Sequence, residues 1–310
     1  MNESIDVIYL AYGAESYQAY VRSFFDSYKA NASGAPHQLI IAATAYRDNP
    51  SGYEELKRLS FENNATIIDL PDNGHEFGAF FSVAERLTAD YIFCFVTSGR
   101  ITKPNWLKVF LSVNRENPQC RLIGSSGSWE TTHPGIWEVL KGRFSSNKST
   151  QPECSATITR ATTQRSRSIL QRIVSVFKLI FRIDRFIDIF RCVKFPNYHI
   201  RTNGFLIERN LYIRYINKYG IPRTRNDAHN IEHGRNHLSK FVKESGFNIG
   251  VVGTNGILYA QQEWDKSATF RCPDTSNAVI VDRQHDAYAE AETPGKKHLE
   301  QLAWGYTITE

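Results

Sequence analysis

The chain has 310 residues, of which 41% are hydrophobic and 22% charged, and it carries a formal net charge of +5. This composition excludes a disordered chain and suits one large domain or two small ones. The net charge is too mild over this length to argue for nucleic-acid binding. The five cysteines are widely spaced and form no CxxC pair, which argues against a disulfide framework or a structural zinc site and favours a reducing cytoplasm.

Short apolar runs alternate with helical patterns over the first 126 residues. We predict strands over 7–10, 38–43, 65–70, 91–96 and 122–125, and helices over 17–30, 53–63, 77–87 and 106–114. Continuous apolar strands separated by helices are typical of βαβ units, so we expect an α/β fold of Rossmann type with a mostly parallel central sheet. Such sheets bind ligands at the carboxyl ends of their strands.

The alternation stops between residues 127 and 197 and then resumes. We predict strands over 204–207 and 248–252, helices over 211–219 and 231–245, and a loop-rich, aromatic tail from residue 256. The chain therefore divides into an N-terminal α/β half over 1–126, an inserted segment over 127–197, and a second half with a C-terminal tail over 198–310.

Two loops that come after predicted strands are candidate ligand-binding loops. Tyr12 and Gly13 come after the first strand, in a loop that lacks the GxGxxG pattern of dinucleotide dehydrogenases and the P-loop pattern. The loop after the third strand contributes five further candidates: Asp72, Asn73, Gly74, Glu76 and Gly78. Its carboxylates accept hydrogen bonds from a ribose or a base, its glycines allow close backbone approach, and the N-terminus of the next helix favours a phosphate. A plain strand-to-helix turn is the alternative for the first loop, and a helix start capped by Asn73 is the alternative for the second.

The fourth strand ends in Thr97-Ser98-Gly99-Arg100, and Pro104-Asn105-Trp106-Leu107 comes next. This pattern resembles the nucleotide-diphospho-sugar transferase (GT-A) fold of family 2-like glycosyltransferases of bacterial surface polysaccharide synthesis. The resemblance covers roughly residues 5–252, and it includes the first strand, the Asn-Gly-x-x-x-Gly loop and the segment around Glu232. It implies a nucleotide-sugar donor bound by the two candidate loops together with Thr97, Ser98 and Arg100.

The sequence departs from this family at the metal site. The family has Asp-x-Asp at the end of the fourth strand, where it binds a divalent metal (Mn or Mg) that bridges the donor's diphosphate, and this chain has Thr97-Ser98-Gly99. Hydroxyls are poor substitutes for the carboxylates that a hard cation prefers. Either the metal is held elsewhere, or cationic side chains such as Arg100 neutralise the diphosphate, which we favour. A degenerate, inactive copy is the third alternative.

A second segment, from Asn226 to Arg235, contains acidic residues where the family has its catalytic base, beside a helix. Glu232 matches that position best, and Asp227 is the alternative. A carboxylate is needed because the acceptor hydroxyl loses a proton as it attacks the anomeric carbon. His229, His233 and His237 recur every four residues and would share one face of a continuous helix. We interpret them as polar pocket or surface residues, with a metal site as the alternative.

Three later residues are candidates for binding the acceptor or a phosphate. Arg201 precedes the strand at 204–207, and Trp264 and Arg271 belong to the aromatic tail. Guanidinium groups bind phosphates, and aromatic rings stack on sugar faces. A surface salt bridge is the alternative for Arg201, and core packing is the alternative for the aromatic residues of the tail.

The segment from Arg160 to Lys194 carries nine Lys/Arg and two Asp, a net +7 against +5 for the whole chain. Ile and Phe are interspersed among these charges, so we predict a basic amphipathic helix that binds anionic membrane surfaces. An oligomer contact or a core helix is the alternative. Residues 1–6 do not resemble a signal peptide, and no apolar run of about 18 residues predicts a spanning helix. We therefore expect a cytoplasmic protein, peripheral on the inner face of the cell membrane.

Together these features predict a glycosyltransferase that moves a sugar from a nucleotide-sugar donor to a glycan or lipid-linked acceptor in O-antigen- or capsule-type polysaccharide synthesis. The surface-polysaccharide context comes from the resemblance alone. A nucleotidyltransferase on a similar fold and a non-catalytic partner protein are the competing hypotheses.

Overall fold

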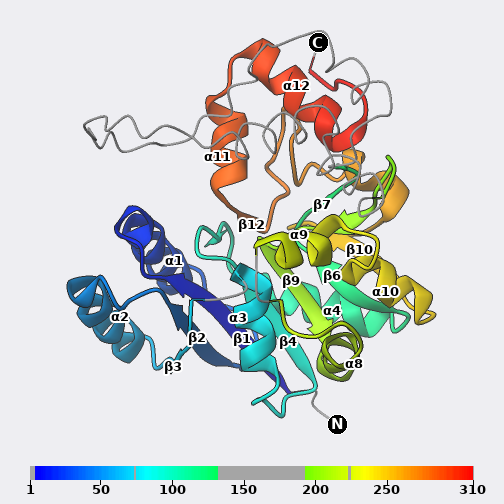
Figure 1. The fold of residues 1–310 in the computed structure, drawn as a ribbon. Helices are drawn as coiled ribbons and strands as arrows, with labels where there is room; N and C mark the ends of the chain where they lie inside the picture. The colour runs from blue at the N-terminus through cyan, green and yellow to red at the C-terminus, as the bar shows by residue number, and fades with distance from the viewer. Residues whose placement is uncertain (1–3, 73–74, 132–192, 223–224, 310) are drawn as a thin grey trace, which may run out of the picture. The chain divides into compact units, whose positions relative to one another are not determined.

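A computed structural model describes residues 4–72, 75–131, 193–222 and 225–309 of the chain (Figure 1). The chain forms two compact units, one made of Met1–Thr131 with Val193–Glu310 and the other of Thr132–Cys192. The second unit lies outside the described residues, and with it lies almost all of the predicted basic helix from Arg160 to Lys194. All described strands and helices belong to the first unit.

Strands and helices alternate along this unit. Its strands are β1 (Ile5–Tyr12), β2 (Gln38–Thr44), β3 (Thr66–Asp69), β4 (Tyr91–Phe95), β5 (Arg100–Ile101), β6 (Cys120–Gly124), β7 (Gly127–Ser128), β8 (His199–Ile200), β9 (Gly204–Glu208), β10 (Asn248–Val252), β11 (Leu258–Ala260) and β12 (Ile280–Val281). Its helices are η1 (Glu15–Tyr17), α1 (Gln18–Ala30), α2 (Pro50–Glu62), α3 (His75–Ala84), α4 (Trp106–Glu116), α8 (Arg209–Tyr219), α9 (Arg225–His233), α10 (Leu238–Glu244), η2 (Gln261–Lys266), α11 (Arg283–Glu290) and α12 (Thr293–Trp304).

The central sheet has eight strands in the order β11-β10-β6-β9-β4-β1-β2-β3. Strands β1, β2, β3 and β4 are parallel to their neighbours in this group, and β6 is parallel to β10, whereas β9 and β11 run antiparallel to the strands beside them. The predicted α/β fold with a mostly parallel sheet is confirmed. Two small pairs, β12 with β5 and β7 with β8, stand outside this sheet.

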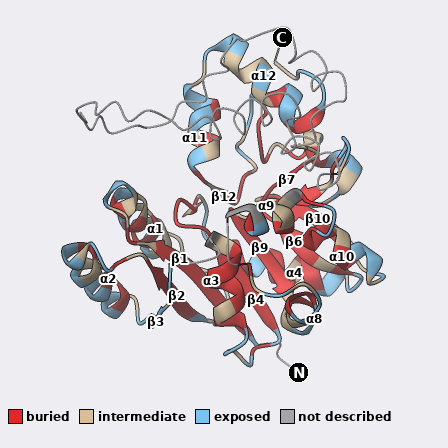
Figure 2. Ribbon diagram, viewed as in Figure 1, coloured by how far each residue is buried: buried red, intermediate tan, exposed pale blue. Residues whose placement is uncertain are grey.

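Helices cover both faces of the sheet and produce two apolar layers. Along β1, Ile8 and Leu10 join the layer beneath α3, α8, α9 and α10, whereas Val7 and Tyr9 join the layer beneath α1, α2 and α4. Figure 2 shows that the strands at the centre of the sheet are buried almost throughout. This burial on both faces explains why the strands appear in the sequence as continuous apolar runs.

The C-terminal tail is more ordered than the sequence predicts. Instead of loops alone it contains β11, β12 and the two helices α11 and α12. Asp282 begins α11 as its N-cap, since its side chain accepts from the backbone N–H groups of Gln284 and His285. The expectation of a loop-rich tail is therefore wrong, because local capping starts a helix that hydrophobic periodicity does not reveal.

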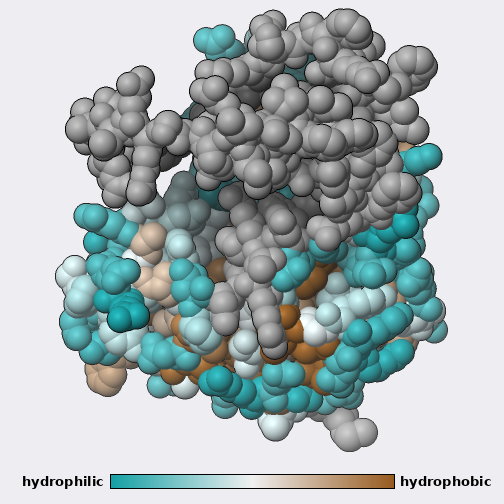
Figure 3. All heavy atoms as spheres, viewed as in Figure 1, coloured by the Kyte–Doolittle hydropathy of each residue, from teal (hydrophilic) through white to brown (hydrophobic). Residues whose placement is uncertain are grey.

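Polar residues cover most of the described surface seen in Figure 3, and apolar residues gather around the position of α3. Within the described part of the chain, no helix has the length and apolar character needed to cross a membrane.

Candidate functional site

The strand order reverses between β1 and β4. The chain passes from β1 outward to β2 and β3, and then returns to place β4 on the other side of β1. In open α/β sheets, the crevice outside the carboxyl ends of such strands is where ligands bind. Tyr12 ends β1, and Thr97 comes shortly after β4, so the sequence-predicted loops of these strands meet at this edge. The Tyr9 hydroxyl ties the two strands together by donating to the Thr97 carbonyl over 2.9 Å.

Tyr12 presents an aromatic ring at this edge. It is half-buried, and its ring meets that of Tyr17 edge to face, with 5.2 Å between the centroids. Burial raises the pKa of the Tyr12 hydroxyl, and the negative charge of Asp72 raises it further. Asp72, which comes after β3, is exposed.

Gly13 has a structural reason to be glycine. A Cβ atom at this position would lie 2.5 Å from the Ala45 carbonyl oxygen, closer than atoms can approach. The Gly13 N–H donates to the Thr44 carbonyl over 2.8 Å, and the Asn49 side chain donates to the Gly13 carbonyl over 2.8 Å. Close packing of the ends of β1 and β2 thus explains this glycine without a ligand.

The loop after β3 is shorter than predicted, because α3 begins at His75. Asn73 and Gly74 lie outside the described residues. Glu76 is half-buried in the first turn of α3, as expected for a carboxylate near the positive end of a helix. Gly78 is buried and is the fourth residue of α3 rather than part of the loop before it, and its carbonyl accepts from Ser82 over 2.8 Å.

At the end of β4, Thr97 and Ser98 are buried, and Gly99 closes a turn by donating to the Val96 carbonyl over 2.9 Å. Arg100 projects from this turn with a quarter of its side chain exposed, and its guanidinium donates to Asp286 of α11 over 2.5 Å. No group of three or more His, Cys, Asp or Glu side chains that could hold a metal ion occurs among the described residues. The Thr97-Ser98-Gly99 turn offers two hydroxyls and no carboxylate, which does not fit a hard divalent cation.

Glu232 stands on α9, half-buried, at the same edge of the sheet. The edge is shared because β9 begins at Gly204 opposite Phe95, the last residue of β4. Thr202 lies just before β9, and its hydroxyl is 3.5 Å from the Glu232 carboxylate. Asp227, the alternative base, is exposed in the first turn of α9. Asp227 and Glu232 are five positions apart on α9, which separates their Cα atoms by about 7.5 Å along the helix axis.

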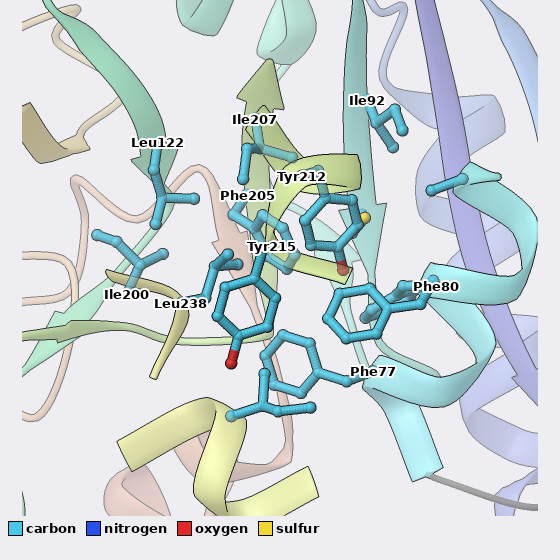
Figure 4. Packing of buried hydrophobic residues seen from close by; sticks show 14 of the residues in the cluster. Phe77, Phe80, Ile92, Leu122, Ile200, Phe205, Ile207, Tyr212, Tyr215 and Leu238 are labelled. Carbon is cyan, nitrogen blue, oxygen red and sulfur yellow. The ribbon is translucent and has the colours of Figure 1, made fainter. Parts of the chain in front are cut away.

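A cavity of about 10 Å³, room for roughly one water molecule, lies beside Glu232. Its other walls are apolar or hydroxyl-bearing: Phe77, Leu122, Ile200, Phe205, Ile231, Leu238 and Ser239. Figure 4 shows the side chains of Phe77, Ile200 and Leu238 among the buried cluster that α3, α8 and the sheet form here. Glu232 therefore has an apolar core on one side and the edge of the sheet on the other.

The predicted helix over 231–245 is two helices. Helix α9 ends at His233 and α10 begins at Leu238. The Gly234 N–H still donates to the Asn230 carbonyl over 3.0 Å, but the buried His237 then serves as N-cap of α10, and its ring accepts from the Lys240 N–H over 3.3 Å. His237 therefore does not continue the helix that carries His229 and His233, and the expectation of one face shared by all three is wrong.

Arg201 and Arg271 take part in a buried charged cluster. Arg201 forms an ion pair with Asp282 over 3.0 Å, and its guanidinium lies 3.8 Å from the centre of the Phe270 ring. Arg271 forms an ion pair with Glu130 over 2.8 Å. Burial lowers the pKa of Arg271, and the charge of Glu130 opposes that shift. Both arginines thus have carboxylate partners within the protein, but the Arg201–Asp282 pair is buried and is not the surface salt bridge that was the alternative for Arg201.

Trp264 is buried, with only 1% of its surface exposed. Its indole N–H donates to the Tyr259 carbonyl over 3.1 Å, and its ring packs on Gly127, where a Cβ would lie 2.3 Å from the ring. These contacts support the core-packing alternative for Trp264.

Sequence reasoning overlooked the part of α11 at this site. Besides the Arg100–Asp286 ion pair, Arg283 of α11 donates to the Tyr17 hydroxyl over 2.9 Å. The sequence does contain one signal for this helix, a capping box formed by Asp282 and His285, three residues later. Each side chain accepts from the backbone N–H of the other residue. That pattern predicts a helix start, but no local pattern predicts that the helix contacts Tyr17, shortly after β1, and Arg100, shortly after β4.

Comparison with known proteins adds a coarse picture. Neither a protein-family model nor a curated protein sequence matches the chain. Among solved structures, glucosyl-3-phosphoglycerate synthase from Mycobacterium tuberculosis with Mn²⁺, UDP and glucosyl-3-phosphoglycerate is 12% identical over 71% of this chain and 67% of its own, with a TM-score of 0.36. S. aureus TarS 1–349 with UDP is 12% identical over 39% of this chain and 34% of its own, with a TM-score of 0.32. A CMP:2-keto-3-deoxy-manno-octonic acid synthetase with CTP is 9% identical over 80% and 88%, with a TM-score of 0.41. Likenesses this distant do not transfer a substrate or a reaction, so the function rests on the residues of this chain itself.

Proposed function

We propose that the protein is a glycosyltransferase that moves a sugar from a nucleotide-sugar donor to a glycan or lipid-linked acceptor in cell-surface polysaccharide synthesis. The observation that carries the proposal is the reversal of strand order between β1 and β4. Tyr12 and the Thr97–Arg100 turn end these two strands, and the carboxylate of Glu232 lies at the same edge. A nucleotide site and a base at one crevice are what sugar transfer requires.

The nucleoside of the donor fits beside Tyr12. A base stacks on an aromatic ring whichever base it is, with about 1–3 kcal/mol of affinity for such a contact. Asp72 is exposed and acts on Tyr12 electrostatically, so its carboxylate is accessible to ribose hydroxyls, from which it can accept. Glu76, in the first turn of α3, is the second carboxylate on this side.

Glu232 acts as the general base in this proposal. Its carboxylate takes the proton of the acceptor hydroxyl, while the hydroxyl oxygen forms a bond to the anomeric carbon. The bond from that carbon to the phosphate oxygen breaks, and the nucleoside diphosphate leaves with the electron pair. The neighbouring Thr202 hydroxyl, 3.5 Å away, orients the carboxylate toward the edge of the sheet.

Cationic side chains stabilise the leaving diphosphate. The Thr97-Ser98-Gly99 turn supplies no carboxylate for a divalent metal, so no step is assigned to one. Arg100 comes directly after that turn, is partly exposed, and carries a guanidinium suited to phosphate oxygens. Arg201 and Arg271 lie deeper and stay candidates for an acidic group of the acceptor.

The membrane role is part of the same proposal. A lipid-linked acceptor would bring the protein to the inner face of the cell membrane, and the segment from Arg160 to Lys194, with its net +7, has the composition that anionic lipid attracts. The proposed location is therefore cytoplasmic and peripheral.

Thermal-shift titration with a panel of nucleotides and nucleotide sugars, combined with product analysis, tests the proposal. A ligand at 100 times its Kd should stabilise the protein by about 2.7 kcal/mol. Tyr12→Leu should reduce that shift, whereas Tyr20→Leu, a neighbouring tyrosine on α1, should not. Sugar transfer or donor hydrolysis supports a glycosyltransferase. Nucleotidyl transfer would replace it with the nucleotidyltransferase hypothesis, and binding of no nucleotide would favour a non-catalytic partner.

A further inference from the structure

Helix α11 directs two charged side chains to residues that come shortly after β1 and β4, the two strands of the crevice. Arg283 and Asp286 are three residues apart and therefore lie on one side of the helix. Arg283 donates to the hydroxyl of Tyr17, whose ring packs on Tyr12 at the end of β1. Asp286 accepts from Arg100 just after β4. The neighbouring His285 and Tyr288 are buried and hold α11 in place.

The ion pairs that Asp282 and Asp286 form with arginines outside α11 differ in burial. Arg201 and Asp282 have side chains that are 12% and 6% exposed, so that pair is shielded from water and fixes the start of α11. Arg100 and Asp286 have side chains that are 25% and 37% exposed, so water and ligands reach them. An ion pair that solvent reaches is weak and exchanges partners readily.

The backbones of the exchangeable pair are held together. Arg100 lies in β5, which pairs with β12 through Arg100 opposite Val281, five residues before Asp286. Only side-chain rotation is then needed to move the Arg100 guanidinium from the carboxylate to another anion. Arg283 lies one helical turn from Asp286 and adds a second cation at the same crevice.

We propose that Asp286 is a built-in competitor for the donor's diphosphate: on donor binding the Arg100 guanidinium leaves the Asp286 carboxylate for a phosphate oxygen, and Arg283 contacts the same diphosphate. Arg283 and Asp286 thereby become determinants of donor affinity. The inference rests on the proposed function, since it assumes a diphosphate at the end of β4. Two guanidinium charges match the two negative charges of a diphosphate ester, and no metal is needed for that balance.

Inorganic pyrophosphate is the probe, titrated calorimetrically into the full chain at low salt with EDTA present. Asp286→Asn should tighten pyrophosphate binding by about 3- to 10-fold, because it removes the competing carboxylate. Arg100→Gln should weaken binding by about tenfold or more, and Arg283→Gln by about 3- to 10-fold. Glu290→Gln is the matched control, since it removes one exposed carboxylate from the same helix, and it should leave the Kd within about twofold.

Asp286→Asn in the Arg100→Gln background decides whether Asp286 acts through Arg100. We expect no tightening there beyond that of the Glu290→Gln control. An equal gain in both backgrounds would mean general charge repulsion, and an unchanged Kd with a lowered melting temperature would mean a purely structural pair; either result overturns the inference. If the protein turns over a nucleotide sugar but none of these variants changes the Kd for pyrophosphate, only this inference falls. If the variants change the Kd for pyrophosphate as expected but no nucleotide sugar is turned over, the proposed function falls.

Discussion

Asp282 anchors α11, the helix that borders the candidate site, and removing its negative charge tests that role. Its carboxylate pairs with Arg201 over 3.0 Å and accepts from the backbone of Gln284 and His285 at the start of α11. Asp282→Asn keeps one oxygen for these capping bonds. It removes the negative charge and replaces the oxygen that accepts from Arg201 with an NH2 group. Arg201 would then keep a positive charge that is 12% exposed and has lost its carboxylate partner.

The size of the effect can be worked out from that burial. Removing one partner of a buried ion pair costs about 3–5 kcal/mol, because the remaining charge is uncompensated. For a domain of this size about 1 kcal/mol shifts the melting temperature by about 2–4 °C, so the variant should melt about 6–20 °C lower. The loss of a cap, about 1 kcal/mol, is not added because the asparagine oxygen still accepts.

Thermal melts at neutral and acid pH measure the effect, with Glu290→Gln as the surface control. Burial alone would raise the pKa of Asp282, but the charge of Arg201 and the hydrogen bond with His285 hold it well below its usual range. Its contribution is therefore present above the unfolded-state pKa of about 4 and is lost as the pH falls toward the folded-state value. The gap between wild type and variant should narrow below about pH 4. A variant that melts within about 2 °C of wild type at neutral pH would refute the claim that this pair anchors α11.

Four further predictions concern catalysis, metal, membrane and core. Glu232→Gln should lower kcat by about 10²–10⁴ with donor binding nearly intact; normal turnover would move attention to Asp227. Activity should survive EDTA, and loss that Mn²⁺ or Mg²⁺ restores would show that a metal is used. The full chain should co-sediment with anionic vesicles at low salt and dissociate as salt rises, and a wholly soluble fraction at low salt would end the membrane hypothesis. Gly127→Ala should lower the free energy of unfolding by about 1–3 kcal/mol, since the new methyl group meets the buried Trp264 ring; a melting temperature unchanged from wild type would contradict that.

The central strands were predictable from the sequence because they are buried on both faces. β1 and β4 consist of apolar runs that the sequence shows directly. Their position next to each other was not predictable, because it results from the reversal of strand order after β3. The antiparallel direction of β9 was not predictable from its residues, since strand direction depends on the path by which the chain returns to the sheet after the inserted segment. The register that places Gly204 opposite Phe95 likewise depends on the tertiary structure and not on local sequence.

The candidate site was predictable only in part. Tyr12 and Thr97 share an edge that the sequence indicated, because the carboxyl ends of parallel strands lie at one edge. The place of Glu232 was not predictable in this way, because it lies on α9 beside the start of the antiparallel strand β9. The partners of the charged residues were not predictable from the sequence. An ion pair such as Arg100 with Asp286 joins positions far apart in the chain and leaves no local periodicity. The same holds for Trp264, which is buried. The sequence alone does not distinguish an aromatic residue that lines a binding site from one that packs in the core.

The residues that border the inserted segment meet each other. The Thr131 hydroxyl donates to the Val193 carbonyl, and the backbones beside them are tied as well, since the Asn197 N–H donates to the Trp129 carbonyl over 2.9 Å. A segment whose two ends lie next to each other can change in length and composition over evolution without moving a strand. Closing a longer loop adds little entropic cost. Related chains can therefore carry inserted segments of different length and charge at this border while the strands of the central sheet keep their order.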